Sequence, residues 1–379
     1  MSWLENASNK MNQWFEKGKP FHAFQALFDA IDTFLLTPNT ITHEGSHIRD
    51  AVDMKRVMMT VIVALMPPLL FGLWNVGYQH YLSLGATVSF WQQFWYGFVK
   101  WLPLVLTVYI SGLAVEIIFA QKRGHQVAEG FFVTGMLIPM IMPPDIPLWI
   151  VAVATIFAVI FGKEVFGGNG YNFLNPALLA RVFVFFAYPS VISGDKVWIA
   201  EKADAYSGAT PLANASAGLT DQLPSLFDLF AGTIPGCIGE TSKIAILLGA
   251  ALLIFTGTAS WRIMLSMTVG AFVTALLFNI FGHSAYMQVP AHEQLLMGGL
   301  LFATVYMATD PVTAPHTRKG HVIFGLLAGG LTILIRQINP GYVEGAMLAV
   351  ILMNIFAPLI DWCVIQQNIR KRQKRISAR

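Results

Sequence analysis

The sequence predicts an all-α membrane protein that crosses the bilayer about ten times. Of the 379 residues, 55% are hydrophobic and only 12% are charged, whereas soluble domains carry about 25% charged residues. The mean hydropathy is +0.58, and long apolar runs recur along the whole chain. A helix needs roughly 20 mostly apolar residues to cross a membrane, so the lipid bilayer is the expected environment of this chain.

Composition also narrows the class of function. The net charge of +3 is small, and no basic stretch is interleaved with aromatic residues, so no nucleic-acid partner is expected. Cys237 and Cys363 provide neither a disulfide framework nor a thiolate metal site, and the nine histidines lack the spacing of a motif such as HExxH. We therefore expect no metal-binding site made by these residues, and the polar start of the chain shows no cleavable signal peptide.

Residues 1–53 precede the first apolar run and are expected to form a cytoplasmic amino-terminal segment. Trp14, Phe15, Phe24 and Ile31 recur at roughly helical spacing. This pattern is typical of an amphipathic helix that lies on a membrane surface or on a partner.

Ten apolar segments follow, and several are shorter than a full crossing. They lie near residues 55–77, 98–120, 131–143, 147–162, 173–188, 243–257, 262–281, 294–309, 321–336 and 342–365. Two of them run into a proline–aspartate break, at Pro143-Pro144-Asp145 and at Asp310-Pro311. Each break is followed by another apolar segment and then by an Asn-Pro pair, at Asn175-Pro176 and at Asn339-Pro340.

These matching breaks predict that residues 54–188 and 243–365 are two five-helix repeats with interrupted helices. Because five is an odd number, the second repeat must be inverted relative to the first, an arrangement that places a site near the midplane in many transporters. Chance similarity between two apolar stretches is the alternative.

The distribution of Lys and Arg predicts the orientation of the chain. These residues gather in the amino-terminal segment, in short loops around 122, 163, 262 and 318, and in the tail 366–379. The loops 78–97, 144–147 and 282–293 contain none. Both termini are therefore expected on the cytoplasmic side, and the long 189–242 loop on the outer side.

The 189–242 loop contains a short stretch of small residues that ends in one exposed hydroxyl. The sequence is Asp204-Ala205-Tyr206-Ser207-Gly208-Ala209-Thr210-Pro211. Gly208 can adopt backbone angles that other residues avoid, and Pro211 fixes its own φ. Composition alone would favour a surface turn.

The D-x-x-S-G-A-T motif resembles the flavinylation motif of the membrane flavoprotein family found in sodium-translocating NADH:quinone reductases and Rnf complexes. In that family a flavin transferase joins FMN through its phosphate to the threonine hydroxyl. The resemblance implies that Thr210 carries covalent FMN, and that the transferase reads Asp204, Ser207, Gly208 and Ala209.

The resemblance extends from the amino-terminal segment to the basic tail. It implies membership of a six-subunit complex in the bacterial inner membrane, in which this chain passes electrons to ubiquinone and couples this to sodium transport. No G-x-G-x-x-G opens a soluble βαβ unit, so NADH oxidation is expected in a partner subunit. One alternative is the Rnf member of the family, whose complex carries out ferredoxin-linked chemistry, but the amino-terminal segment favours the quinone-reductase member. A second alternative is a flavin-free channel or transporter of the same architecture.

A glycine-rich stretch before residue 176 supplies a second candidate site. Asn172 and Asn175 lie three residues apart beside a cluster of three glycines, and an asparagine amide can both donate and accept hydrogen bonds. These residues suit a loop with a helix cap equally well. The resemblance implies that the family also binds non-covalent riboflavin, with Asn172 and Asn175 as its contacts here.

Charged residues inside apolar segments are the third group of candidate functional residues. Glu116 and Asp361 are candidates for the sodium path, because carboxylates inside a membrane usually line an interior or a pathway. Solvation at the cytoplasmic interface, with help from Arg123 or from the basic tail, is the alternative. Gly112 lies one helical turn from Glu116, where it either leaves a slot for quinone or only allows close helix packing. Arg181 has no nearby partner in the sequence and could pair with a carboxylate or with a flavin phosphate.

Overall fold

The computed structural model describes residues 54–123, 130–168, 170–194, 197–203, 206–339, 341 and 344–377, with six further single positions before residue 50. The regular structure of these residues is helical throughout, which confirms the predicted all-α class. The helix predicted within residues 1–53 lies outside the described residues.

The described helices follow the predicted apolar segments in order. Before the long loop they are α3 (Met54–Ser83), α4 (Phe90–Arg123), α5 (Gly130–Ile141), α6 (Leu148–Gly162) and α7 (Pro176–Ala187). The loop contains the short helices α8 (Pro211–Ser216) and α9 (Leu226–Ala231). After it come α10 (Lys243–Phe255), α11 (Trp261–Phe281), α12 (Ala291–Leu296), α13 (Leu300–Phe302), the π-helical turn η5 (Ala303–Met307), α14 (Arg318–Ile338) and α15 (Ala346–Ser377).

Six of these helices are long and apolar enough to cross a membrane. The spans are Lys55–Ser83, Phe90–Arg123, Leu148–Phe166, Trp261–Phe281, Arg318–Ile338 and Ala346–Ile376, while α5, α7 and α10 are shorter apolar helices. The chain is therefore a multi-pass membrane protein. The arrangement of two inverted five-helix repeats stays a prediction.

The two predicted breaks have visible local causes. Helix α5 ends at Ile141, just before Pro143 and Pro144, because proline lacks an N–H and disfavours helical angles in the residue before it. The second predicted break, at Asp310-Pro311, lies between η5, which ends at Met307, and α14, which begins at Arg318. The segment before it is further divided into α12, α13 and η5, which was not predicted. Gly298 separates the pieces with a φ of +62°, a conformation that glycine adopts at little cost.

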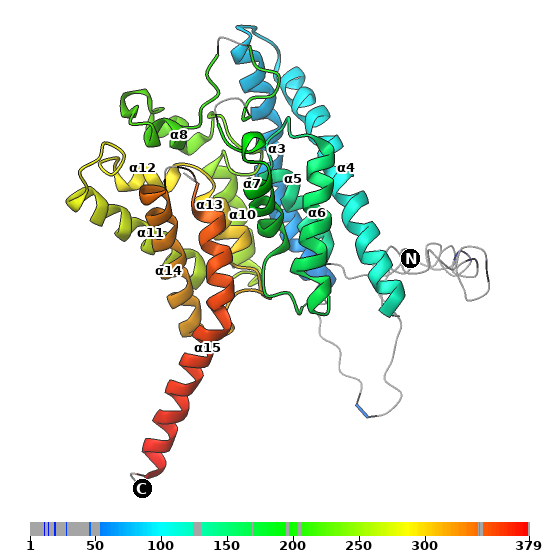
Figure 1. Cartoon of the computed structure of the whole chain (residues 1–379), viewed down its shortest axis with the longest axis vertical. Helices are drawn as coiled ribbons and strands as arrows, with labels where there is room; N and C mark the ends of the chain where they lie inside the picture. The colour runs from blue at the N-terminus through cyan, green and yellow to red at the C-terminus, as the bar shows by residue number, and fades with distance from the viewer. Residues whose placement is uncertain are drawn as a thin grey trace.

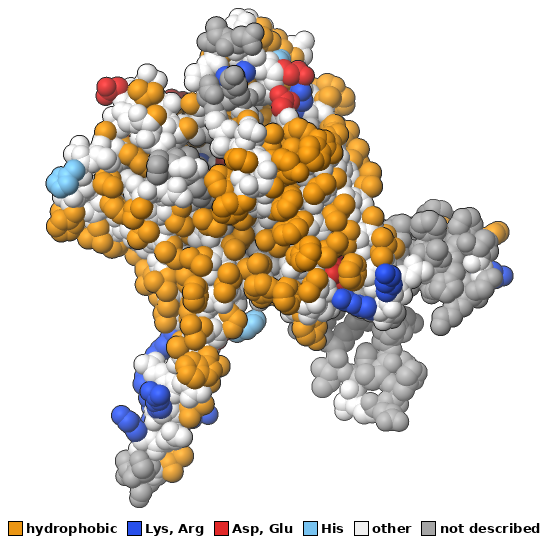
Figure 2. Space-filling view, viewed as in Figure 1, with side chains coloured by type: hydrophobic (Ala, Val, Ile, Leu, Met, Phe, Trp, Pro, Cys, Tyr) orange, Lys and Arg blue, Asp and Glu red, His pale blue; other side chains and the backbone are white. Residues whose placement is uncertain are grey.

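Small residues allow the helices to approach one another closely. A Cβ added at Gly329 of α14 would lie 1.9 Å from the carbonyl oxygen of Met267 in α11, and one at Gly97 of α4 would lie 1.8 Å from that of Leu73 in α3. Glycine at such contacts lets membrane helices gain van der Waals packing. The outward surface is covered by large apolar side chains, which form a broad band in Figure 2.

The ends of the bundle differ in what they carry. Helix α8, which follows Thr210, lies at the opposite end of the molecule from the carboxyl-terminal end of α15 (Figure 1). Lys and Arg side chains gather at that end of α15 and at the end of α4 (Figure 2). The Thr210 loop and the basic ends therefore lie on opposite sides of the apolar band.

Candidate functional site

Thr210 is the N-cap of α8 and borders a cavity at the loop end of the bundle. Its Oγ1 accepts a hydrogen bond of 3.2 Å from the backbone N–H of Ala213, which is the usual role of an N-cap threonine. Gly208 is buried, and the Ser207 hydroxyl accepts a hydrogen bond from the Ala209 N–H at 3.5 Å. Asp204, the first residue of the motif, lies outside the described residues.

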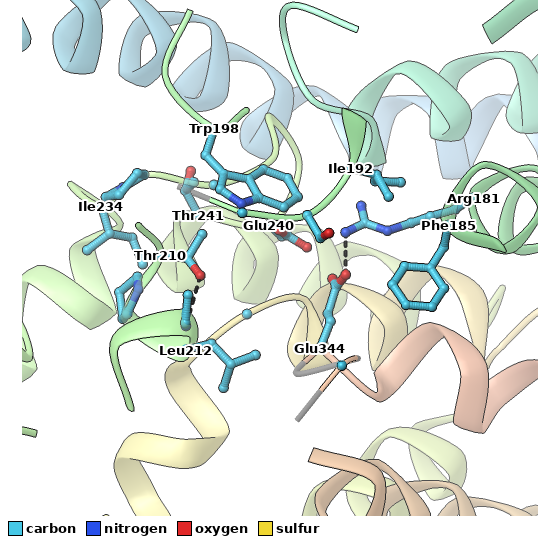
Figure 3. Close-up of a pocket in the computed structure, with 18 of the residues that line it drawn as sticks. Arg181, Phe185, Ile192, Trp198, Thr210, Leu212, Ile234, Glu240, Thr241 and Glu344 are labelled. Atoms are coloured by element: carbon cyan, nitrogen blue, oxygen red, sulfur yellow. Dashed lines mark hydrogen bonds and ion pairs between the residues drawn. The ribbon is translucent and has the colours of Figure 1, made fainter. Parts of the chain in front are cut away.

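The cavity beside Thr210 combines aromatic and charged walls, and its volume of about 760 Å³ includes space that is open to solvent. Trp198 and Phe185 contribute aromatic rings, and Figure 3 shows Thr210 on one side of the pocket, with Arg181 and Glu344 on the other. We call this cavity the Thr210 pocket.

Arg181 lines the Thr210 pocket and is held in place by contacts with distant parts of the chain. Only 2% of its surface is exposed. Its guanidinium donates to Oε2 of Glu344 and to the carbonyl oxygen of Ile141, and contacts the sulfur of Cys237 at 3.1 Å. Of the two partners that the sequence left open, the structure thus supplies a carboxylate, 163 residues away along the chain.

A second buried cation lies against the same pocket. Lys243 is 1% exposed, and its Nζ donates to the carbonyl oxygens of Glu240 at 2.6 Å, of Thr241 at 3.1 Å and of Gly298 at 3.5 Å. Buried charges of this kind need such partners. The pocket lining therefore combines two cations, Arg181 and Lys243, with two carboxyl groups, Glu240 and Glu344, and two aromatic rings beside the threonine hydroxyl.

A second cavity, the Asn172–Asn175 pocket, has a volume of about 790 Å³ that includes space open to solvent. Both amides line it, together with the first turns of α3, Lys163 of the α6–α7 connection, Tyr306 of η5 and Asp310. The sequence placed Asn172 and Asn175 at the start of a helix, and α7 does begin directly after them, at Pro176.

The two amides make different contacts. The Oδ1 of Asn175 caps α7 by accepting from the N–H groups of Ala177 at 2.9 Å and Leu178 at 3.4 Å, and its Nδ2 donates to Asp310 at 3.3 Å. The Nδ2 of Asn172 makes one longer contact, to the carbonyl oxygen of Leu174 at 3.4 Å. Asn175 therefore caps α7 and also lines the pocket, whereas Asn172 lines the pocket and contributes little to holding the structure together.

Glu116 has an internal partner that the sequence did not indicate. It is 2% exposed within α4, and Nζ of Lys163 donates to its Oε1. The basic residue expected beside it, Arg123, instead pairs with Glu164 at 3.1 Å. Because Lys163 also lines the Asn172–Asn175 pocket, the buried pair connects Glu116 to that pocket.

Asp361 and Gly112 both take part in helix packing. The carboxylate of Asp361, in α15, accepts hydrogen bonds from the N–H groups of His316 at 2.6 Å and Thr317 at 3.0 Å, and from the Thr317 hydroxyl at 2.6 Å. A Cβ added at Gly112 would lie 2.0 Å from the ring of Phe131. The ring of Phe131 therefore fills the space beside Gly112 that could have formed a slot.

Several residues of the Thr210 pocket were missed by the sequence analysis. Glu240, Lys243 and Glu344 line it, and Trp198 lies over Arg181 with 5.9 Å between the guanidinium carbon and the ring centre. The only sequence signal was a charge at or near the start of an apolar segment. Such charges usually belong to loops at the membrane surface, so they did not stand out.

The chain is similar to known proteins over nearly its whole length. A sequence model of the NQR2, RnfD, RnfE family matches residues 41–370. The B subunit of the Na(+)-translocating NADH-quinone reductase from Chromohalobacter salexigens is 43% identical, covering 99% of this chain and 97% of the relative. The proteins of the same name from Stutzerimonas stutzeri and Azotobacter vinelandii are each 43% identical, covering 97% of this chain and 98% of the relative.

Proposed function

This chain belongs to the NQR2, RnfD, RnfE family, and from that premise we propose that it is the B-type membrane component of a sodium-translocating NADH-quinone reductase. As such it is part of a multi-subunit oxidoreductase that reduces quinone and transports sodium. NADH is oxidised in a partner subunit. The relatives of the same name, similar at both ends of the chain, favour this function over the Rnf member of the family and over a flavin-free transporter.

The position of Thr210 supports the proposal that this chain carries covalent FMN. Its hydroxyl borders a cavity walled by Trp198, Phe185, Arg181 and Lys243, so FMN joined to it through a phosphoester would have aromatic and cationic neighbours. A flavin transferase makes this bond on the outer face of the bacterial inner membrane. In the oxidoreductase, bound FMN supplies one-electron chemistry, while the chain's own residues position it and offset its charge.

The Asn172–Asn175 pocket is the proposed site of riboflavin. Its amide groups suit the donor and acceptor edge of a flavin ring or the ribityl hydroxyls. Electrons then enter from a partner subunit at the Thr210 pocket, reach the Asn172–Asn175 pocket and leave to ubiquinone. Because Phe131 fills the space beside Gly112, we no longer place the quinone there. Glu116 and Asp361 remain the proposed carboxylates of the sodium path.

Mass spectrometry of the peptide that contains Thr210 tests the central proposal. The wild-type chain should carry the mass of FMN and fluoresce under ultraviolet light in a denaturing gel, whereas Thr210→Ala should be dark. Thr210→Ser keeps a hydroxyl and should retain part of the label. A fluorescent Thr210→Ala chain, or an unmodified wild-type peptide from cells that contain the transferase, would refute covalent FMN at this residue.

A further inference from the structure

The carboxyl groups of Glu240 and Glu344 face each other beside the Thr210 pocket. They come from the connections that precede α10 and α15, outside both helices. Glu240 is 6% exposed and the side chain of Glu344 is 14% exposed. A Cβ added at Gly299 would lie 2.4 Å from Oε2 of Glu240 and 2.8 Å from Oε1 of Glu344. Both oxygens therefore adjoin the same small space above Gly299.

The contacts of the two carboxyl groups leave one oxygen of each group facing the other. Oε2 of Glu344 accepts from Arg181, and Oε1 of Glu240 accepts from the N–H of Cys237 at 3.3 Å. The two facing oxygens have no further protein partner in the described part of the chain. Because an ionised carboxylate can only accept hydrogen bonds, the two facing oxygens can pair with each other only if one of them carries a proton.

The charged groups around the pair shift the pKa values of Glu240 and Glu344 in opposite directions. Arg181 of α7, Lys243 of α10 and Arg336 of α14 face it, and Cys237 adjoins Glu240. Burial, and then the charge of Glu240, raise the pKa of Glu344. Burial alone would also raise the pKa of Glu240, but Arg181, the hydrogen bond with Glu344 and Lys243 outweigh it, so the pKa of Glu240 is lowered. Two neighbouring acids whose pKa values are pushed apart titrate as one unit.

We propose that Glu240 and Glu344 form a redox-linked proton site, which takes up a second proton when an electron enters the Thr210 pocket. This rests on the proposed function, because it requires a flavin on Thr210. A negative charge added to a buried pocket is costly unless it is compensated. One electron comes from the partner subunit and one proton from water, which converts the remaining carboxylate to a neutral acid. When the pocket is oxidised again, the electron leaves it and the carboxyl group releases the proton to water. Ser193 and Gly194 line the pocket and are exposed, so water reaches it from the loop end.

Redox titration of the purified complex at several pH values tests this site. The relevant component is the one that is absent from the Thr210→Ala complex. With one proton per electron, its midpoint potential should fall by about 59 mV per pH unit in the wild type. Glu240→Gln should abolish this slope, because the amide still accepts from Cys237 but cannot be protonated. Gly299→Ala, whose new Cβ would separate the two oxygens, should reduce the slope while both acids are present.

Infrared difference spectra give a readout that does not depend on activity. Reduction of the wild type should produce a carboxylic acid C=O band, which should be missing in Glu240→Gln. Glu293→Gln, a change from acid to amide in α12 outside the Thr210 pocket, should leave both the band and the slope unchanged. A wild-type slope in Glu240→Gln, or a wild-type potential that does not depend on pH, would overturn the proposal. A dark chain in the gel would instead overturn the flavin on Thr210.

Discussion

Replacing Asn172 and Asn175 separately can distinguish a flavin contact from a helix cap. Within the described part of the chain Asn172 makes a single protein hydrogen bond, of 3.4 Å, so Asn172→Ala should cost little stability. If its amide also bonds riboflavin, the variant should lose about 1 kcal/mol of binding free energy, roughly a fivefold loss of affinity. With both amides replaced by alanine, the expected loss is about 2 kcal/mol, or roughly thirtyfold.

Asn175 needs a second variant because its Oδ1 caps α7. Loss of an N-cap costs about 1 kcal/mol of stability, so Asn175→Ala should lower the thermal unfolding midpoint as well as riboflavin content. Asn175→Ser retains a capping oxygen and loses the amide N–H₂ that faces Asp310 at 3.3 Å. It should therefore keep its unfolding midpoint and still bind riboflavin less tightly.

The assay is the amount of riboflavin extracted per complex after extensive washing. Fluorescence of the Thr210 chain in a denaturing gel serves as the internal standard, since covalent FMN should be unaffected. Stoichiometric riboflavin in both Asn172→Ala and the double alanine variant would show that these amides are only structural.

Three further predictions concern ion coupling, orientation and packing. Glu116→Gln and Asp361→Asn should each raise the sodium concentration needed for half-maximal quinone reduction; wild-type sodium curves in both would assign the two carboxylates to structure alone. In a background without Cys237 and Cys363, a cysteine at the exposed Ala217 of the long loop should react with an impermeant thiol reagent in intact cells, and labelling only after lysis would reverse the proposed orientation. Gly112→Ala should destabilise the chain by about 1–3 kcal/mol through overpacking against Phe131, measured by thermal unfolding, and Phe131→Leu should relieve the loss; equal stability of Gly112→Ala and wild type would contradict this packing.

Much of the fold could be predicted because crossing a membrane is a local property of the sequence. Each predicted apolar segment coincides with described helical residues, since length and apolar composition alone decide which stretches suit the bilayer. The breaks after α5 and after η5 follow from proline and aspartate in the chain itself. Thr210 was singled out by a contiguous motif, which needs no knowledge of distant residues.

The partners of the buried charges were decided only by the tertiary structure. Arg181 meets Glu344 across 163 residues and Glu116 meets Lys163 across 47, and neither spacing leaves a periodic signal. Glu240 and Glu344 adjoin one another only because Gly299 leaves room for both. Apolar periodicity shows which segments enter the membrane, but the positions of charged side chains depend on which helix faces meet. In a low-dielectric interior those meetings determine the energy of every buried charge, so the pocket beside Thr210 became visible only when the helices were packed.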